Sequence, residues 1–255
     1  MSERWIRFEH AGSAGWGRLD GDRVEVRSGS LYGSSRPTGD VLPLAEVELL
    51  MPVQPSKVLA LWNNFGALRA KLGLALPEEP LYLIKSPNGY LAPNGTIRKP
   101  PGDGKLVFEG ELGIVIGKAC SAVGQAQAIE HVFGYTCGND ATLADELHRD
   151  PSFPQWVRAK GHDTFCPLGP AVASGLDPAT LRVQTLVDGV VRQDYPVSDM
   201  TFPVARLVSL LSHDMTLLPG DVILCGTSVG AGSMKPGSRV DVRIDGIGTL
   251  SNRVA

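Results

Sequence analysis

The chain has 255 residues, of which 43% are hydrophobic and 20% are charged, and its formal net charge is −3. This composition is typical of a globular protein with a sizeable core, and the slightly acidic balance argues against nucleic acid or an anionic membrane as a partner. No apolar run approaches the ~20 residues of a membrane span, and the N-terminus MSERWIRFEH lacks the apolar region of a signal peptide.

The first fifty residues are expected to form a small β unit. The segments WIRFEH, WGRLD and DRVEVR have the character of strands, and glycine-containing turns separate them. SGSLYGSSRPTGD, which is rich in Gly, Ser and Pro, is expected to be a loop. The sequence therefore indicates a small N-terminal β domain over residues 1–54 and a main domain over residues 55–255.

A short helix and a strand are expected at the start of the main domain. Asn63 and Asn64 offer N-caps for a helix whose apolar residues recur at helical spacing, and Gly73 is its expected stop. PLYLIK, which ends at Lys85, has the pattern of a strand. A loop rich in Pro and Gly follows from residue 87 to residue 104.

The stretch VFEGELGIVIG, residues 107–117, is predicted to be a buried strand that contains two glutamates. Because side chains alternate between the faces of a strand, Glu109 and Glu111 are expected to share a face with Val107 and Val115. Two ionised carboxylates close together in apolar surroundings are costly unless a cation joins them. The stretch therefore predicts a partner of positive charge.

The rest of the chain is predicted to be β-rich, with a few short helices. A helix is expected near residues 122–130, and the strand VFGYTCGND then ends at Asp140. Hairpins are expected about Asp188-Gly189 and Asp245-Gly246, and a helix from Pro203 to residue 212. This order of elements lacks regular βαβ alternation and predicts a β-rich mixed α/β fold.

Three carboxylates in this pattern suggest a metal site. Carboxylate oxygens are hard ligands for Mg²⁺, Mn²⁺ or Ca²⁺, so Glu109, Glu111 and Asp140 are the candidate ligands. Lys160, in WVRAKGHDTF, is a candidate cation beside them, and with one divalent ion the formal charges sum to zero. The alternative is that both glutamates lie on a solvated face, because E-x-E is a common pattern.

Five ordered segments of the main domain resemble the fumarylacetoacetate hydrolase (FAH) family. They are VFEGELGIVIGK, VFGYTCGND, WVRAKGHDTFCPLGP, LLPGDVILCGTSVGAG and GIGTLSNRV. The resemblance implies an FAH-type mixed β-sandwich roll, a homodimer or larger assembly, and Mg²⁺ or Mn²⁺ as cofactor. It carries the family's metal ligands over to Glu109, Glu111 and Asp140, and its active-site lysine to Lys160.

The resemblance also implies a substrate site. It places Thr227, in CGTSVG, near the substrate carboxylate and Lys85 at the border of the pocket. Backbone N–H groups of the Gly-rich turn, including those of Gly226 and Gly230, are expected to bind that carboxylate. The implied substrate is a small 2-oxo or 1,3-diketo acid. Cleavage next to its keto group leaves an enolate, whose charge a cation stabilises.

The implied reaction is hydrolytic C–C bond cleavage, in the catabolism of aromatic compounds. However, the positions of the family's lid histidine and glutamate carry Leu68 and Lys71 here, and an arginine and a glutamine that often follow the metal-binding aspartate are replaced by Ala144 and Leu147. This departure leaves isomerisation, tautomerisation or decarboxylation of 2-oxo or hydroxymuconate-type acids as the alternative. A second alternative is a catalytically degenerate protein that binds 2-oxo acids.

Two further expectations concern His148 and the cysteines. His148 lies eight residues after Asp140 and is a candidate replacement for the missing base, although such a histidine is more often surface-exposed. Four cysteines are scattered along the chain without a C-x-x-C pair. They are expected to be reduced thiols in the core of a cytoplasmic protein.

Overall fold

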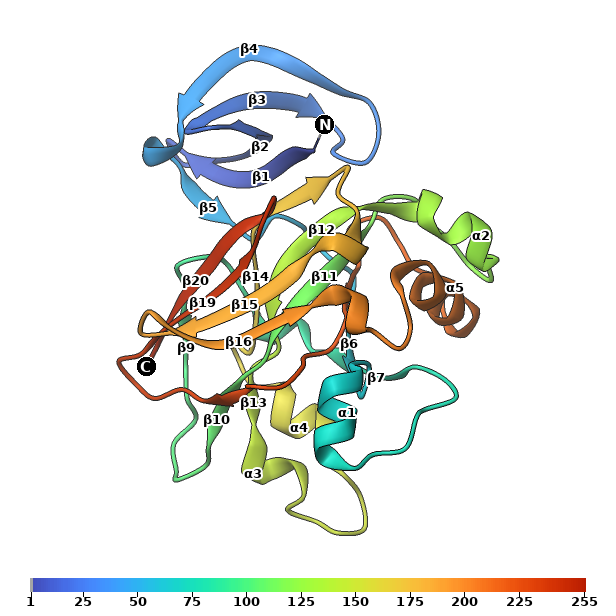
Figure 1. The fold of residues 1–255 in the computed structure, drawn as a ribbon. Coiled ribbons are helices and arrows are strands. Elements are labelled where there is room, and N and C mark those ends of the chain that lie inside the picture. The colour runs from blue at the N-terminus through green and yellow to red at the C-terminus, as the bar shows by residue number, and fades with distance from the viewer. Residues whose placement is uncertain (1) are drawn as a thin grey trace.

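The structure is a computed structural model that describes residues 2–255. Its strands form three sheets, and the largest follows the order β4-β3-β2-β1-β14-β12-β11-β17-β6-β7, with β5 paired to β1 and β8 to β14. Helices are few and short, and they lie around the sheets (Figure 1). The prediction of a β-rich mixed α/β fold is confirmed.

The N-terminal strands form a lobe at one end of the molecule (Figure 1). They are β1 (Glu3–His10), β2 (Ser13–Asp20), β3 (Arg23–Gly29), β4 (Ser35–Pro43) and β5 (Glu48–Leu50). β4 begins within the stretch expected to be a loop, residues 28–40, because its backbone pairs with β3 despite the Gly, Ser and Pro content. β1 also pairs with β14, so this lobe continues the large sheet.

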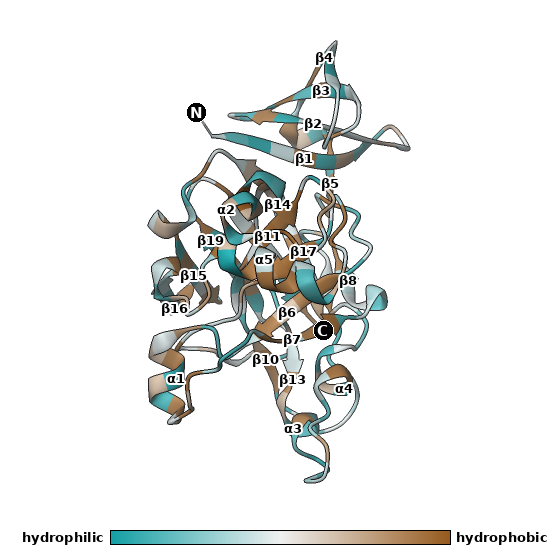
Figure 2. Cartoon of the chain, turned by 90° about the vertical axis from the view of Figure 1, so that its right-hand side faces the viewer, coloured by the Kyte–Doolittle hydropathy of each residue, from teal (hydrophilic) through white to brown (hydrophobic). Residues whose placement is uncertain are grey.

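The remaining strands of the large sheet come from the main part of the chain. They are β6 (Val58–Trp62), β7 (Leu81–Lys85), β8 (Tyr90–Leu91), β11 (Gly110–Ile116), β12 (Val132–Asn139), β14 (Cys166–Ser174) and β17 (Val222–Leu224). Their colour in Figure 2 is mostly that of apolar residues, as expected for strands covered on both faces. All four cysteines are buried and free, as predicted.

Two smaller sheets complete the fold. One contains β10 (Leu106–Phe108), β13 (Thr142–Leu143) and β18 (Gly232–Ser233), and the other contains β9 (Thr96–Ile97), β15 (Arg182–Val187), β16 (Val190–Pro196), β19 (Arg239–Ile244) and β20 (Gly248–Val254). The expected hairpins about Asp188-Gly189 and Asp245-Gly246 are confirmed by the pairing of β15 with β16 and of β19 with β20. Side chains of the larger of these sheets join those of β6, β11 and α5 in one core cluster.

The helices are α1 (Gly66–Leu72), α2 (Gln125–Ala128), α3 (Ala144–Leu147), α4 (Trp156–Lys160) and α5 (Val204–Asp214). Gly73 ends α1 in the left-handed conformation, as predicted. The expectation that Asn63 and Asn64 cap α1 is wrong, because Phe65 is the N-cap residue. The Asn64 side chain instead bonds the backbone of Cys225 and Phe202. Among residues 2–255, no helix is long and apolar enough to cross a membrane.

The stretch of residues 107–117 is not one strand. β10 ends at Phe108 and belongs to a different sheet from β11, which begins at Gly110, so Glu109 lies at the point where the chain changes sheet. Val107 therefore does not share a sheet face with Glu111, and this part of the prediction is wrong. The change of sheet nevertheless leaves Glu109 beside Glu111, at the edge where β12 also ends.

Asp221, at the start of β17, is a buried carboxylate that joins two parallel strands. Its oxygens accept hydrogen bonds from the backbone N–H groups of Ser56, Lys57 and Leu218, and its Oδ2 lies 2.5 Å from the Lys57 ammonium. These contacts hold the chain before β6 against β17, with which β6 pairs. Asp221 is therefore a structural ion-pair site rather than part of the carboxylate cluster.

We expect Asp221→Asn to lower the free energy of unfolding by about 3 kcal/mol, because it leaves Lys57 and one backbone donor without a charged acceptor. Urea denaturation measures this change. Asp103→Asn, at an exposed position, is the matched control and should leave the midpoint unchanged. A loss below about 1 kcal/mol would show that the ion pair is not a main link between the two strands.

Candidate metal and active site

Three carboxylates converge where β10, β11 and β12 meet. The ligand oxygens of Glu109, Glu111 and Asp140 lie within 4.8 Å of one another. Glu111 and Asp140 are buried, whereas 14% of the Glu109 side chain is exposed, so the cluster opens to solvent on the side of Glu109. The structure thus brings together the three residues predicted as metal ligands.

Two lysines neutralise most of the charge of this cluster. The ammonium group of Lys160, at the end of α4, donates hydrogen bonds to Asp140 Oδ2 at 2.6 Å and to Glu109 Oε2 at 2.9 Å. The ammonium group of Lys85, at the end of β7, donates to Asp140 Oδ1 at 2.6 Å. Lys85 is buried and its contacts are with Asp140 and Ala141, so its expected place at the border of a pocket is corrected to one inside the cluster.

The pKa values of the cluster move in opposite directions. Burial raises the pKa of Glu111 well above its usual range, and the charges of Asp140 and Glu109 raise it further. Burial would also raise the pKa of Asp140, but Lys160 and Lys85 outweigh it, so that this pKa is lowered. Burial would lower the pKa of Lys160, but Asp140 and Glu109 raise it. Lys160 is therefore held as an ammonium ion.

Glu111 is the carboxylate of the cluster whose negative charge is least compensated. Its Oε2 accepts a hydrogen bond from the Gly226 N–H at 2.8 Å, but its Oε1 is buried and has no hydrogen-bond partner in the described part of the chain. A buried carboxylate oxygen without a donor is unfavourable, and a divalent cation between the three carboxylates would satisfy it. The donor set, which consists of oxygens alone, fits Mg²⁺ or Mn²⁺ rather than a metal that prefers thiolate or imidazole.

Neighbouring side chains, two of which (Thr142 and Gln193) the sequence did not single out, position this cluster. Thr142 Oγ1 contacts both Glu109 Oε1 at 2.9 Å and Lys160 Nζ at 2.6 Å, and Asn139 Oδ1 accepts a hydrogen bond from the Glu109 N–H. Gln193, from β16, accepts from the Gly110 N–H and donates to Thr227. Thr142 could have been found from its position two residues after Asp140. Gln193 carries no such signal, because β16 is distant in sequence.

The turn after β17 differs in part from the expectation. The Gly226 N–H donates to Glu111, so in place of the expected substrate carboxylate it binds a member of the carboxylate cluster. Thr227 is nearly buried, and its hydroxyl donates to the Gly110 carbonyl beside the two glutamates. Gly230 is exposed and lies against the Arg192 carbonyl of β16, where a Cβ atom would clash. The structure thus brings Thr227 to the cluster but shows no such link for Gly230.

The structure does not bring His148 into the site. His148 follows α3, is exposed, and makes no side-chain hydrogen bond or ion pair with the rest of residues 2–255, so its proposed catalytic role is corrected. His162 is paired with Glu146, because its Nε2 lies 2.9 Å from Glu146 Oε2. In the lid, Leu68 is half-buried and Lys71 is exposed on α1, so neither supplies a base.

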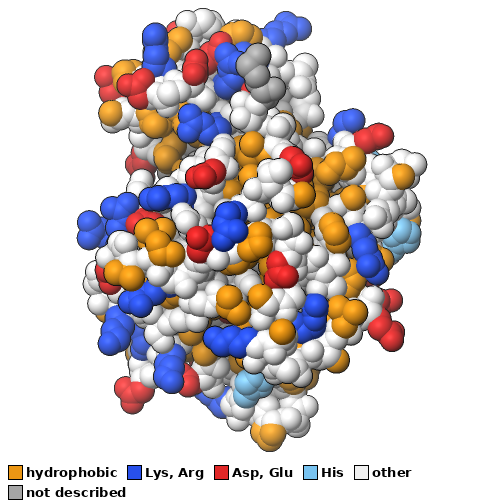
Figure 3. Space-filling view, in the orientation of Figure 1, with side chains coloured by type: hydrophobic (Ala, Val, Ile, Leu, Met, Phe, Trp, Pro, Cys, Tyr) orange, Lys and Arg blue, Asp and Glu red, His pale blue; other side chains and the backbone are white. Residues whose placement is uncertain are grey.

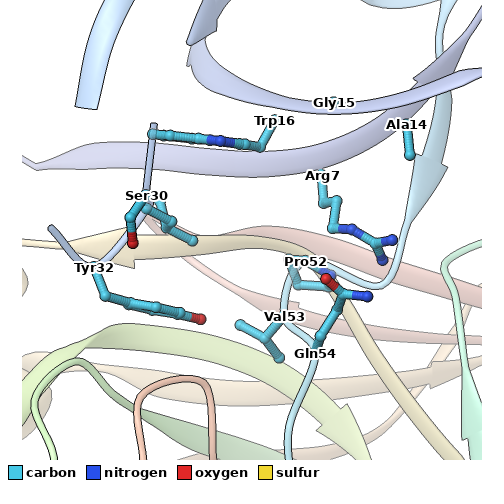
Figure 4. A pocket seen from close by; sticks show the side chains of 10 residues that line it. Arg7, Ala14, Gly15, Trp16, Ser30, Tyr32, Pro52, Val53 and Gln54 are labelled. Carbon is cyan, nitrogen blue, oxygen red and sulfur yellow. The ribbon is translucent and has the colours of Figure 1, made fainter. Parts of the chain in front are cut away.

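A cavity lies away from these carboxylates. It has a volume of about 450 Å³ and lies between the N-terminal lobe and the segment of residues 52–54. Arg7, Trp16, Tyr32 and Gln54 are among the side chains that line it (Figure 4), and none belongs to the carboxylate cluster. On the face seen in Figure 3, basic and acidic side chains are interspersed over both the lobe and the main body.

Three carboxylates and two lysines at one edge of this β-sheet fold form a donor set that fits a hard divalent cation. Residues 57–255 match the family model for the C-terminal part of fumarylacetoacetate (FAA) hydrolase, and residues 3–52 match the model "Rv2993c-like, N-terminal". The first match covers most of the chain. The chain therefore belongs to the fumarylacetoacetate hydrolase family.

Individual relatives agree with this assignment. The chain is 43% identical to protein Rv2993c of Mycobacterium tuberculosis (88% of this chain, 84% of the relative) and 35% identical to the oxaloacetate tautomerase YisK of Bacillus subtilis (92% and 84%). It also resembles the crystal structure of 5-carboxymethyl-2-hydroxymuconate delta-isomerase from Mycobacterium smegmatis, with a TM-score of 0.92, 39% identity and 99% of each chain covered.

A more distant solved structure is informative about ligands. It is fumarylpyruvate hydrolase from Pseudomonas aeruginosa in complex with Mn²⁺ and pyruvate, with a TM-score of 0.73, 31% identity and coverage of 80% of this chain and 91% of that one. The relatives thus include tautomerases, isomerases and hydrolases. The chain is therefore an FAH-family enzyme. Family membership alone does not determine which of these reactions it catalyses.

Proposed function

We propose that this protein catalyses proton-transfer isomerisation, such as keto–enol tautomerisation, of a small 2-oxo acid with the help of Mg²⁺ or Mn²⁺. Glu109, Glu111 and Asp140 would hold the ion. The observation that supports this most is the buried, unpaired Oε1 of Glu111 between two other carboxylates. When bound, the ion would supply Lewis-acid polarisation of the substrate's keto oxygen.

The charges of the cluster favour an anionic substrate. Three carboxylates and two ammonium groups leave a formal charge of −1, and a divalent ion converts this to +1. The carboxylate of a 2-oxo acid brings the total to zero, which makes its binding in a partly buried site favourable. With Lys160 alone, the three carboxylates and a divalent ion would sum to a formal charge of zero. The ammonium group of Lys85 raises this sum to +1.

Lys160 is suited to stabilise negative charge rather than to accept a proton. Its pKa is raised by Asp140 and Glu109, and its ammonium group is bound by the oxygens of both carboxylates and of Thr142. A fixed ammonium close to the reacting oxygen favours the enolate form over the keto form. This role serves tautomerisation, isomerisation and C–C bond cleavage equally.

The side chains around the cluster favour isomerisation over hydrolysis. Hydrolysis needs a group that activates water, but His148 is exposed, and the lid positions carry Leu68 and Lys71. Two relatives named as a tautomerase and an isomerase support the same choice. Hydrolytic C–C cleavage of a 1,3-diketo acid is the second candidate, which the family model and the fumarylpyruvate hydrolase structure support.

We expect the enzyme to accelerate conversion of enol-oxaloacetate to its keto form in the presence of Mn²⁺, and removal of the ion with EDTA to reduce the rate at least 100-fold. The loss of ultraviolet absorbance of the enol measures the rate. Hydrolysis is tested in parallel with acetylpyruvate, whose cleavage yields acetate and pyruvate. Cleavage without tautomerisation would replace the proposal by the hydrolase candidate.

The degenerate-protein alternative gives a different result in the same assays. A 2-oxo acid would then raise the melting temperature of the Mn²⁺-loaded protein, while neither substrate would be turned over. The homodimer or larger assembly and the role in catabolism of aromatic compounds remain predictions of the family resemblance. Light scattering of the purified protein measures the first of these.

A further inference from the structure

An apolar cavity of about 620 Å³ lies between β7 and the segment that leads into α4. Nine of its eleven lining residues are apolar or aromatic, and Gln155 and Arg158 are the exceptions. The lining residues are Trp62, Leu81, Tyr82, Leu83, Ile84, Phe153, Pro154, Gln155, Trp156, Val157 and Arg158. Its outer wall is exposed, since Phe153 and Val157 are 67% and 62% accessible.

The register of the large sheet places this cavity beside the carboxylates. Gly113, Leu224, Ala60 and Leu83 lie opposite one another on the adjacent strands β11, β17, β6 and β7. Two residues further along β11, β6 and β7, Glu111, Trp62 and Leu81 lie on the same face, and Gly226, just after the end of β17, donates to the Glu111 side chain between them. Trp62 therefore lies two strands from Glu111, a separation of about 10 Å.

α4 lies over this face of the large sheet, near both the carboxylates and the apolar cavity. It packs against β7, and its Trp156 ring lies 5.2 Å from the Trp62 ring. Lys160 follows Trp156 by four residues, so both side chains project from the same face of the helix. One end of α4 thus reaches the carboxylates through Lys160, and its other end contributes Trp156 to the wall of the apolar cavity.

We propose that this cavity, the tail pocket, receives the non-reacting end of the substrate, and that the preferred substrate is a 2-oxo acid with an apolar, aromatic tail. The inference rests on the proposed function. The carboxylate and keto group would lie at Glu109, Glu111 and Asp140, and the tail would extend over Trp62 towards Leu81. Two tryptophans offer flat surfaces against which an aromatic ring packs favourably. A short dicarboxylate such as oxaloacetate would leave the tail pocket empty.

Phenylpyruvate and pyruvate test this inference because they differ only by the phenyl group. We expect the Mn²⁺-loaded protein to bind phenylpyruvate at least tenfold more tightly than pyruvate, because the ring is removed from water in the tail pocket. Isothermal titration calorimetry measures both dissociation constants. The enzyme should also accelerate tautomerisation of enol-phenylpyruvate with a higher kcat/KM than that of enol-oxaloacetate.

Two variants of the tail pocket should reduce the ratio of the two dissociation constants below threefold. Trp156→Ala removes one aromatic wall, and Leu81→Glu places a carboxylate in the apolar mouth. Val191→Ala is the matched control, because Val191 is an exposed apolar residue of β16, outside this cavity, and should leave the ratio unchanged. Circular dichroism confirms that each variant is folded.

Three outcomes would overturn the inference. Equal affinity for both acids in the unchanged protein would show that the tail does not occupy the cavity. A ratio that the two variants leave unchanged would place the phenyl group elsewhere. A dimer that Leu81→Glu dissociates, without a change in the ratio, would show that a second copy of the chain covers the cavity. Absence of binding for both acids is a separate result and would contradict the proposed function instead.

Discussion

Replacement of Glu111 by glutamine should abolish binding of Mn²⁺ and with it the activity, while the metal-free protein becomes more stable. Glu111 is fully buried, and its Oε1 has no hydrogen-bond donor among residues 2–255. Its pKa is raised by burial first, and then by Asp140 and Glu109, so ionisation of Glu111 costs folding free energy. A glutamine keeps the acceptor for the Gly226 N–H and removes the charge.

The two expected effects have opposite signs. Without metal, Glu111→Gln brings the formal charge of the cluster from −1 to zero, and its amide can donate to a neighbouring carboxylate, so the unfolding free energy should rise by about 1 kcal/mol. With metal, the variant loses one of three charged ligands, and affinity for Mn²⁺ should fall at least 100-fold. Thermal unfolding with and without Mn²⁺, together with calorimetric titration of the ion, measures both.

Glu130→Gln is the matched control, because Glu130 is exposed and lies before β12, at the opposite end of that strand from Asp140. It should change neither the stability nor the Mn²⁺ affinity. A Glu111→Gln protein that binds Mn²⁺ as tightly as the unchanged protein would contradict the assignment of Glu111 as a ligand. A less stable metal-free variant would show instead that Glu111 is already compensated by a group that the structure does not identify.

The carboxylate cluster could be predicted from sequence because each of its members lies at the end of a strand, where a charged side chain needs a specific reason. Glu111 lies at the start of β11 and Asp140 directly follows β12, and these two strands are neighbours. The hairpin turns were also predictable, since Asp188-Gly189 and Asp245-Gly246 have local conformational preferences. In these cases, the information lies within a few residues of the chain.

Other features depend on the curvature of the sheets and could not be predicted. The chain changes sheet at Glu109 although residues 107–117 have a continuous strand pattern. Lys85 reaches Asp140 across 55 residues of sequence. The same holds for Trp62 and Trp156, which meet only because α4 packs over β7. Alternation of apolar and polar residues fixes the face of a strand, but not which distant element covers that face.

The second large effect is expected for Lys160→Met. The methionine keeps the length of the side chain but removes the ammonium group that donates to Asp140 and Glu109. The metal-free cluster then carries a formal charge of −2, so the unfolding free energy should fall by about 3 kcal/mol or more. Activity in the presence of saturating Mn²⁺ should fall about 100-fold, because one fixed positive charge near the developing enolate is lost.

The metal distinguishes this role of Lys160 from a merely structural one. With Mn²⁺ bound, the variant cluster is formally neutral, so Mn²⁺ should raise the melting temperature of Lys160→Met by more than it raises that of the unchanged protein. Lys118→Met, at an exposed position, is the control for loss of a lysine and should alter neither quantity. If Mn²⁺ restored both the stability and the full activity of Lys160→Met, the lysine would serve only to balance charge in the metal-free protein. Restored stability without restored activity is the result we expect, because charge compensation by the ion does not replace an ammonium group positioned at the substrate.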